Sequence, residues 1–133
     1  MSADRALYVD SSALVKLAVE EPESAALRRY LRRRKPLVSS ALARTEVLRA
    51  MLPLGAAAIR RGSDVLSSID LIRISDRVLA DAGGLLPEDL RSLDAIHVAT
   101  MRQLGSSLGR VVTYDERLRV TATSLGFAVV APV

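Results

Sequence analysis

The chain has 133 residues, of which 50% are hydrophobic and 26% are charged, and its formal net charge is +4. This length and composition predict one globular domain with its own core and exclude an intrinsically disordered chain. The absence of cysteine excludes disulfides, a catalytic thiol and cysteine-ligated zinc. The positive charge, carried mostly by arginine, is compatible with a polyanionic partner, but codon bias can produce the same composition.

The apolar stretch near the N-terminus is short and runs only from Ala6 to Val9. It is too short for the hydrophobic core of a signal peptide, and no other apolar run approaches the roughly 20 residues that cross a bilayer. We therefore expect a cytoplasmic protein without membrane association.

Strand and helix patterns alternate along the first half of the chain. A short apolar run ends at Asp10, and the serines that follow are good helix N-caps. Farther on, Pro22 and the acids beside it suit the start of a helix, and Pro53 and Gly55 break a later one. In chain order the predicted elements are a strand at 7–9, helices at 13–19 and 20–34, a strand at 37–39, and helices at 41–52 and 56–67.

The second half continues the alternation. Ser75 or Asp76 starts a helix, and the longest helical pattern of the chain ends at Gly105. The predicted elements are a strand at 71–74, helices at 75–83 and 87–104, a strand at 111–113, a helix at 115–125 and a strand at 127–130. This alternation predicts an α/β fold with a mostly parallel sheet of four or five strands, flanked by helices on both faces. Without a linker or an internal repeat, residues 1–133 are expected to form a single domain.

Four carboxylates occupy positions where a lone acid would be costly. Asp10 and Asp115 follow apolar, strand-like runs, whereas Glu46 and Asp94 lie inside helical patterns. Burying an unpaired carboxylate is unfavourable, so acids that converge need either protons or a cation between them. Ligands of open parallel sheets bind beyond the carboxyl ends of the strands. If the first and fourth strands are neighbours, Asp10 and Asp115 face each other there.

The same acids also have structural interpretations. Asp10 can complement the N-terminus of the helix that follows it, and Asp115 can cap another helix. Thr113 and Glu116 also fit a capping box. The two acids inside helices are harder to explain in this way. Four acids at related points of the topology together favour a site.

Oxygen ligands alone would favour a hard cation, Mg²⁺ or Mn²⁺, over zinc. Such an ion keeps several waters, which leaves room for phosphate oxygens. The chemistry that follows is hydrolysis of a phosphodiester bond by a metal-activated water. It needs no lysine, histidine or covalent nucleophile, so the residues predict a metal-dependent hydrolase.

Several polar residues near the acids have open roles. His97, the single histidine, is either a general acid or a packing residue that hydrogen-bonds within the fold. Ser11, Ser12 and Thr113 are interpreted as caps and as groups that orient the carboxylates. The basic cluster at residues 28–35 either binds RNA backbone or lies at a helix C-terminus, where it satisfies the macrodipole.

The residues around the four acids resemble those of the PIN-domain ribonucleases, and specifically the VapC-type toxins of bacterial toxin–antitoxin pairs. The matching motifs follow the family's order and span the chain from near its start to near its end. They are Tyr8-Val9-Asp10-Ser11-Ser12-Ala13-Leu14-Val15-Lys16-Leu17, Ser40-Ala41-Leu42-Ala43-Arg44-Thr45-Glu46-Val47, Leu93-Asp94-Ala95-Ile96-His97-Val98-Ala99 and Val112-Thr113-Tyr114-Asp115-Glu116-Arg117-Leu118. Residues 53–88 carry no matching motif.

The resemblance implies an endoribonuclease that depends on Mg²⁺ or Mn²⁺. It implies that Asp10, Glu46, Asp94 and Asp115 line one metal site. Asp10 and Asp94 would contact the ion directly, and Asp115 directly or through water. The resemblance also implies a homodimer and an antitoxin that occludes the site. The implied substrate is a structured RNA such as tRNA or ribosomal RNA, so cleavage would inhibit translation.

Other functions remain open. A PIN-like nuclease can process RNA outside a toxin–antitoxin pair, and a PIN-like module can bind RNA or partners without cleaving. A phosphoacceptor signalling domain also places acids at the strand ends of a doubly wound sheet. It would need a phosphorylatable Asp after the third strand and usually a Lys after the fifth. Here Asp76 follows the third strand, and no lysine lies near residues 127–130.

Overall fold

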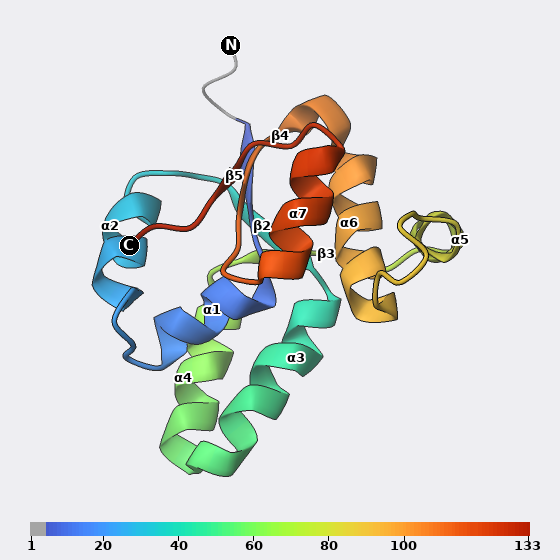
Figure 1. Cartoon of the computed structure of the whole chain (residues 1–133). Helices are drawn as coiled ribbons and strands as arrows, with labels where there is room; N and C mark the ends of the chain where they lie inside the picture. The colour runs from blue at the N-terminus through green and yellow to red at the C-terminus, as the bar shows by residue number, and fades with distance from the viewer. Residues whose placement is uncertain (1–4) are drawn as a thin grey trace.

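The computed structural model describes residues 5–133. Its centre is a five-stranded sheet with the strand order β3-β2-β1-β4-β5 (Figure 1). Every neighbouring pair of strands is parallel, which confirms the predicted type of sheet. The strands are β1 (Ala6–Val9), β2 (Leu37–Ser40), β3 (Asp70–Ile72), β4 (Leu108–Val112) and β5 (Val129–Val130).

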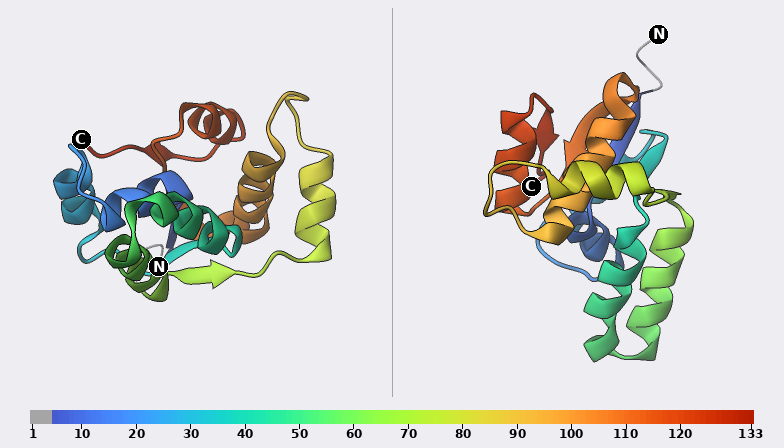
Figure 2. Two further views of the ribbon diagram at one scale, coloured as in Figure 1. Left: turned by 90° about the horizontal axis from the view of Figure 1, so that it is seen from below. Right: turned by 90° about the vertical axis from the view of Figure 1, so that its right-hand side faces the viewer.

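Helices cover both faces of the sheet, as the alternating pattern predicts. The helices α1 to α4 pack on one face and α6 and α7 on the other, while α5 packs on α6, farther from the sheet (Figure 2). None of the helices formed by residues 5–133 is both long and apolar enough to cross a bilayer. The helices are α1 (Ser11–Ala18), α2 (Ser24–Leu31), α3 (Leu42–Met51), α4 (Ala56–Ser67), α5 (Asp76–Gly83), α6 (Ser92–Leu104) and α7 (Glu116–Ser124), with short 3₁₀ segments η2 (Leu52–Leu54) and η3 (Gly105–Ser107).

The core has two parts, one on each face of the sheet, because side chains alternate along a strand. In β1, Leu7 and Val9 belong to the part under α1 to α4, whereas Ala6 and Tyr8 belong to the part under α6 and α7. All four side chains are buried. The central strand is therefore apolar on both faces, and its first polar residue comes where the strand ends.

The second helix is shorter than the predicted range of 20–34. Pro22 lies in a turn before α2, where the Ser24 N–H donates to the Glu21 carbonyl (3.0 Å). At the other end, Arg32 leaves helical backbone angles and Arg33 has a φ of +69°. The chain turns there toward the start of β2, so the last residues of the basic cluster lie outside the helix.

Other boundaries differ by a few residues. The helix predicted from residue 87 begins at Ser92, because Arg91 has extended backbone angles (φ −67°, ψ 148°). β3 ends at Ile72, where its pairing with β2 also ends, and β4 begins at Leu108, three residues earlier than predicted. The other predicted helices are confirmed to within two residues at each end.

Candidate active site

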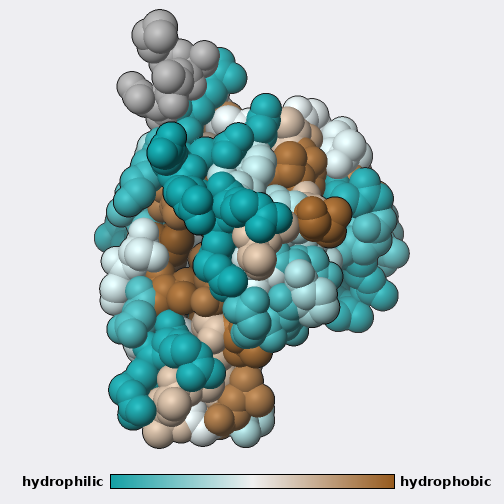
Figure 3. Space-filling model, turned by 90° about the vertical axis from the view of Figure 1, so that its left-hand side faces the viewer, coloured by the Kyte–Doolittle hydropathy of each residue, from teal (hydrophilic) through white to brown (hydrophobic). Residues whose placement is uncertain are grey.

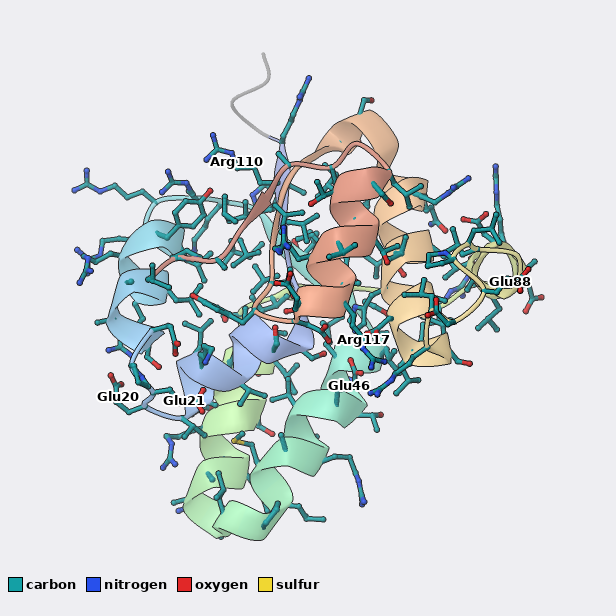
Figure 4. All side chains as sticks on the ribbon, in the orientation of Figure 1. Glu20, Glu21, Glu46, Glu88, Arg110 and Arg117 are labelled. Carbon is teal, nitrogen blue, oxygen red and sulfur yellow. The ribbon has the colours of Figure 1, made fainter. Side chains whose placement is uncertain are left out.

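The carboxyl ends of β1 and β4 carry two of the four predicted acids. β1 pairs with β4, with Val9 beside Val112, so the neighbour relation that the prediction required is confirmed. Asp10 directly follows β1, and Asp115 lies between β4 and α7. Glu46, on α3, lies toward this end of the sheet, whereas Arg110 lies at the opposite end (Figure 4).

Asp10 is 4% exposed and is hydrogen-bonded on both carboxylate oxygens. Its Oδ1 accepts from Ser12 Oγ (2.6 Å) and from the Ala13 N–H (3.2 Å), and its Oδ2 accepts from Thr113 Oγ1 (2.7 Å). The bond from Ala13 makes Asp10 the N-cap of α1. Burial raises the pKa of Asp10, and these hydrogen bonds offset only part of the rise. Asp10 is therefore both a helix cap and a buried acid at the strand end.

Thr113 connects the two acids at the strand ends. Its hydroxyl donates to Asp10 and accepts from the N–H of Asp115 (3.0 Å). Asp115 in turn caps α7, because its Oδ1 accepts from the N–H groups of Arg117 (2.9 Å) and Leu118 (3.2 Å). The two strand-end acids thus share one rigid set of hydrogen bonds.

A chain of hydrogen bonds runs from Glu46 into the core. Glu46 Oε1 accepts from Ser11 Oγ (2.5 Å) and lies 2.7 Å from His97 Nε2. The other ring nitrogen, Nδ1, lies 2.6 Å from the hydroxyl of Tyr8, which accepts from the Ser40 N–H. Burial raises the pKa of Tyr8, so the phenol keeps its proton. Because an ionised carboxylate only accepts hydrogen bonds, the Nε2–H of His97 donates to Glu46.

This chain keeps Glu46 ionised. Burial alone would raise the pKa of Glu46, but the hydrogen bonds from His97 and Ser11 outweigh burial and hold the pKa below its ordinary value. The Glu46 side chain is 25% exposed, so its carboxylate also reaches solvent. His97, at 3% exposure, has the hydrogen-bonding role rather than that of an accessible acid.

Tyr8 is a member of this chain that the sequence interpretation did not identify. It lies 89 residues from His97 in the sequence, so no local pattern links the two. The available signal was a tyrosine in a buried strand, because a buried phenol usually needs a hydrogen-bond partner.

Asp94, in the first turn of α6, is half-buried. Burial raises its pKa, and the negative charges of Asp115 and Glu46 raise it further. His97 and Arg91 offset part of this rise. Because their charges act on Asp94, Asp115 and Glu46 lie near it in the fold, although the three acids come from different helices and loops.

The acids do not form a closed metal cage. Within residues 5–133, no three acidic, histidine or cysteine side chains are grouped closely enough to hold a cation together. Mg²⁺ requires no such cage, because it keeps most of its waters and is commonly bound by one or two carboxylates. The repulsion felt by Asp94 is the kind that a cation relieves. The residues present therefore fit a hydrated Mg²⁺ or Mn²⁺ that has few direct protein ligands.

The cap of α7 depends on Asp115. The predicted capping box of Thr113 and Glu116 is wrong, because Glu116 pairs with Arg119 and Thr113 with the Asp115 N–H. We expect Asp115→Ala to lower the free energy of unfolding by about 0.5–2 kcal/mol, and Asp115→Asn to cost far less because Asn is an equally good cap. Urea unfolding of both variants tests this, and an Ala variant as stable as the Asn variant would contradict the cap.

The pKa shifts predict how the stability of the metal-free protein depends on pH. The pKa values of Asp10 and Asp94 are raised above 3.8, so the folded protein binds these two protons more tightly than the unfolded chain does. This contribution to stability is lost as the pH rises through the folded-state pKa values. Glu46 makes the opposite contribution, because its pKa is lowered from 4.5. The stability that it adds is lost only as the pH falls below that ordinary value. Once the pH exceeds the ordinary carboxyl range, we therefore expect the free energy of unfolding in EDTA to fall until Asp10 and Asp94 are both ionised in the folded protein. In urea titrations from pH 5 to 8, Asp10→Asn should show a flatter dependence, whereas a wild-type stability that rises over this range would refute the assignment.

Comparison with known proteins identifies the family of the chain and several relatives. The PIN domain family matches residues 7–123 of the chain. Ribonuclease VapC46 of Mycobacterium tuberculosis is 61% identical over 127 residues, which cover 96% of this chain and 98% of that protein. Ribonuclease VapC35 of the same species is 40% identical over 130 residues, which cover 95% of this chain and 96% of that protein.

Solved structures share the fold. VapC20 of Mycobacterium tuberculosis, described as a sarcin–ricin loop cleaving toxin, superposes with a TM-score of 0.73 at 20% identity and covers 95% of this chain and 99% of its own. A toxin–antitoxin complex from Klebsiella pneumoniae has a TM-score of 0.73 at 22% identity, with 96% of this chain and 98% of that chain covered. By its match to the PIN domain and its identity to these ribonucleases, the chain belongs to the PIN-domain family and is of the VapC type.

Proposed function

We propose that this chain is a Mg²⁺- or Mn²⁺-dependent endoribonuclease that acts as the toxin of a toxin–antitoxin pair. The proposed substrate is a structured RNA, tRNA or ribosomal RNA, cleaved in the cytoplasm so that translation is inhibited. The observation that carries the proposal is the group of acids at the carboxyl ends of β1 and β4, where Asp94 is repelled by Asp115 and Glu46. The 61% identity to a protein named as a ribonuclease supports the reaction type.

In the proposed site, Asp10 and Asp94 hold the cation and Asp115 contributes directly or through a water. A bound divalent cation lowers the pKa of a coordinated water and neutralises charge on the phosphate. Thr113 and Ser12 keep the Asp10 carboxylate in place through their hydroxyl hydrogen bonds. These three acids share the task of holding the cation, and no covalent nucleophile is required.

Glu46 has a different proposed task from the metal ligands. Its hydrogen bonds to His97 and Ser11 use Oε1, and its carboxylate is partly exposed. Glu46 therefore offers an ionised oxygen that can orient the attacking water. His97 and Tyr8 act as positioning residues, because they hold this carboxylate without reaching the substrate.

We also propose that the chain pairs with an antitoxin and forms a homodimer. A solved relative of the same fold is described as a toxin–antitoxin complex. On the chain itself, Leu52 and Leu54 in η2 are each 56% exposed and offer apolar surface that an amphipathic helix of the antitoxin can cover. Expression of the chain alone should arrest growth, and co-expression with the antitoxin should relieve the arrest. Growth without arrest, with soluble and nuclease-active protein present, would contradict the toxin role.

The phosphoacceptor alternative has no support in the fold. β3 is an edge strand, and Asp76, which follows it, is exposed at the start of α5. A phosphoacceptor of doubly wound fold would instead need its acid at the switch point near the centre of the sheet. A non-cleaving RNA-binding module is distinguished by the experiment below.

The proposed reaction is tested by the ends of the RNA products. A metal-activated water leaves a 5′-phosphate and a 3′-hydroxyl, so the 5′ product ends should accept no further phosphate until a phosphatase has acted. Activity should disappear in EDTA and return with Mg²⁺ or Mn²⁺. Products with a 2′,3′-cyclic phosphate, or RNA binding without cleavage, would overturn the proposal. The control variant is Asp64→Asn, which replaces an exposed acid on α4 outside the proposed site and should cleave RNA like the wild type.

A further inference from the structure

A strongly basic pocket lies at the end of the sheet opposite to Asp10. It has a volume of about 420 Å³ and is formed by the starts of β1 and β4 and by the segment between α2 and β2. Five cationic side chains and no acid line it. We call it the basic pocket, and its polar lining residues are Arg5, Tyr30, Arg33, Arg34, Lys35 and Arg110.

Figure 3 shows the surrounding surface. On the face drawn there, hydrophilic residues gather toward the end that carries the N-terminus, and hydrophobic surface lies mostly below them. In Figure 4, Arg110 lies at this same end of the molecule, away from Glu46. The basic pocket is therefore separate from the proposed catalytic site.

Tyr30 holds two of the guanidinium groups in place. Arg110 Nη1 donates to the Tyr30 hydroxyl (2.8 Å), and the guanidinium of Arg34 lies 4.0 Å from the centre of the Tyr30 ring. Arg34 Nη1 also donates to the Tyr30 carbonyl (2.5 Å). These contacts orient the arginines without neutralising them, because none of the partners is an acid.

The macrodipole of α2 does not account for this charge. The helix ends at Leu31, so Arg33, Arg34 and Lys35 lie beyond its last turn. Arg28, which lies in the last turn, is paired with Glu20 (3.0 Å). Among the ion pairs formed by residues 5–133, none includes a cation of the basic pocket. The positive charge of the basic pocket is therefore not neutralised by any acid of the described residues, and an anionic ligand can bind there.

Arg33 adds an independent observation. Its φ of +69° lies in the left-handed region, and it is the one residue other than glycine with a positive φ in the described chain. This conformation is unfavourable for a side chain such as Arg and is adopted readily by Gly or Asn. A strained residue kept in a pocket is commonly kept for function.

We propose that the basic pocket binds the phosphodiester backbone of RNA at a distance from the cleaved bond. The inference rests on the proposed function, because the RNA is taken to be the substrate. Five cations from three chain segments exceed the charge of a single phosphate and suit a row of phosphates. Arginine forks bind phosphate oxygens in pairs, which suits arginine to contacts with a nucleic-acid backbone. The basic pocket lies at the start of β4 and the acids beyond its end, so one RNA strand that follows the sheet can reach both.

The test measures binding of a folded tRNA by fluorescence anisotropy in EDTA between 50 and 200 mM salt, with the RNA checked for integrity. The pocket variant carries both Arg33→Gln and Arg110→Gln. The control variant carries both Arg60→Gln and Arg73→Gln, which replace two exposed arginines outside the pocket. We expect the pocket variant to bind about tenfold more weakly, with a salt slope lower by about 2, since each lost phosphate contact removes about 0.9. The control should keep the wild-type affinity and slope.

Arg33→Gly separates binding from folding. It removes one cation and relieves the strain, so we expect a melting temperature equal to or above that of the wild type, with RNA affinity roughly threefold lower. Wild-type affinity in the double variant would overturn the inference. If polyglutamate competes as strongly as RNA, the inference is overturned and the pocket binds an acidic protein. If inorganic phosphate alone displaces the RNA, the inference is overturned and the pocket binds a single phosphate. A wild type that binds tRNA through the pocket but never cleaves RNA would refute the proposed function and leave the pocket standing.

Discussion

Asp94→Asn is expected to abolish RNA cleavage while leaving the metal-free protein as stable as the wild type or more stable. The pKa of Asp94 is raised by burial and by the charges of Asp115 and Glu46, so its ionised form is unfavourable in the metal-free fold. Asn removes that charge and keeps the size of the side chain. Loss of groups that only orient a metal ligand typically costs 10–100-fold in activity, so loss of a ligand should cost about 100-fold or more. Cleavage rates in Mg²⁺ and melting temperatures in EDTA measure the two effects.

The control for this prediction is Asp64→Asn, which removes an exposed carboxylate of α4. It should change neither cleavage nor melting temperature by more than the small effects usual for surface substitutions. If Asp94→Asn instead melts well below the wild type in EDTA and still cleaves RNA, Asp94 is a structural residue.

Mg²⁺ is expected to stabilise the wild type and to stabilise Asp94→Asn much less. A ligand that binds only the folded state adds about 2.7 kcal/mol to the free energy of unfolding at 100 times its dissociation constant. For a domain of this length that corresponds to a rise in melting temperature on the order of 10 °C. Thermal unfolding with Mg²⁺ and with EDTA measures the rise, and added NaCl at equal ionic strength controls for screening.

An equal rise in the wild type and in Asp94→Asn would place the ion elsewhere on the protein. No rise at all would leave the acids without a cation under these conditions. Either result would contradict the proposed metal site.

Much of the fold was predictable because its determinants are local. Apolar runs such as 7–9 are too short for helices, and the apolar periodicity between them is helical. The pairing of β1 with β4 was stated only as a condition, because strand order depends on contacts between residues about 100 positions apart. The starts of α2 and α6 differ from the predicted ones, because Pro22 lies in a turn and Arg91 has extended backbone angles. Charge and periodicity do not report such local backbone angles.

The candidate site was predictable in its acids but not in its connections. Asp10 and Asp115 were given two competing interpretations, cap and site, and the structure combines the cap with the position at the strand end. The hydrogen bonds from Tyr8 through His97 to Glu46 join β1, α6 and α3, which only the folded chain brings together. The sequence pattern could not show this chain, because its members lie far apart and Tyr8 has the pattern of an ordinary core residue.

A titration with Mn²⁺ followed by electron paramagnetic resonance tests the metal site at the ends of β1 and β4 most directly, since the signal counts free ion. We expect the wild type and Asp64→Asn to bind Mn²⁺ in competition with Mg²⁺. Asp94→Asn should bind it at least about tenfold more weakly. Equal binding of Mn²⁺ by Asp94→Asn, together with full RNA cleavage by wild-type protein in excess EDTA, would contradict a metal-dependent nuclease site formed by these acids.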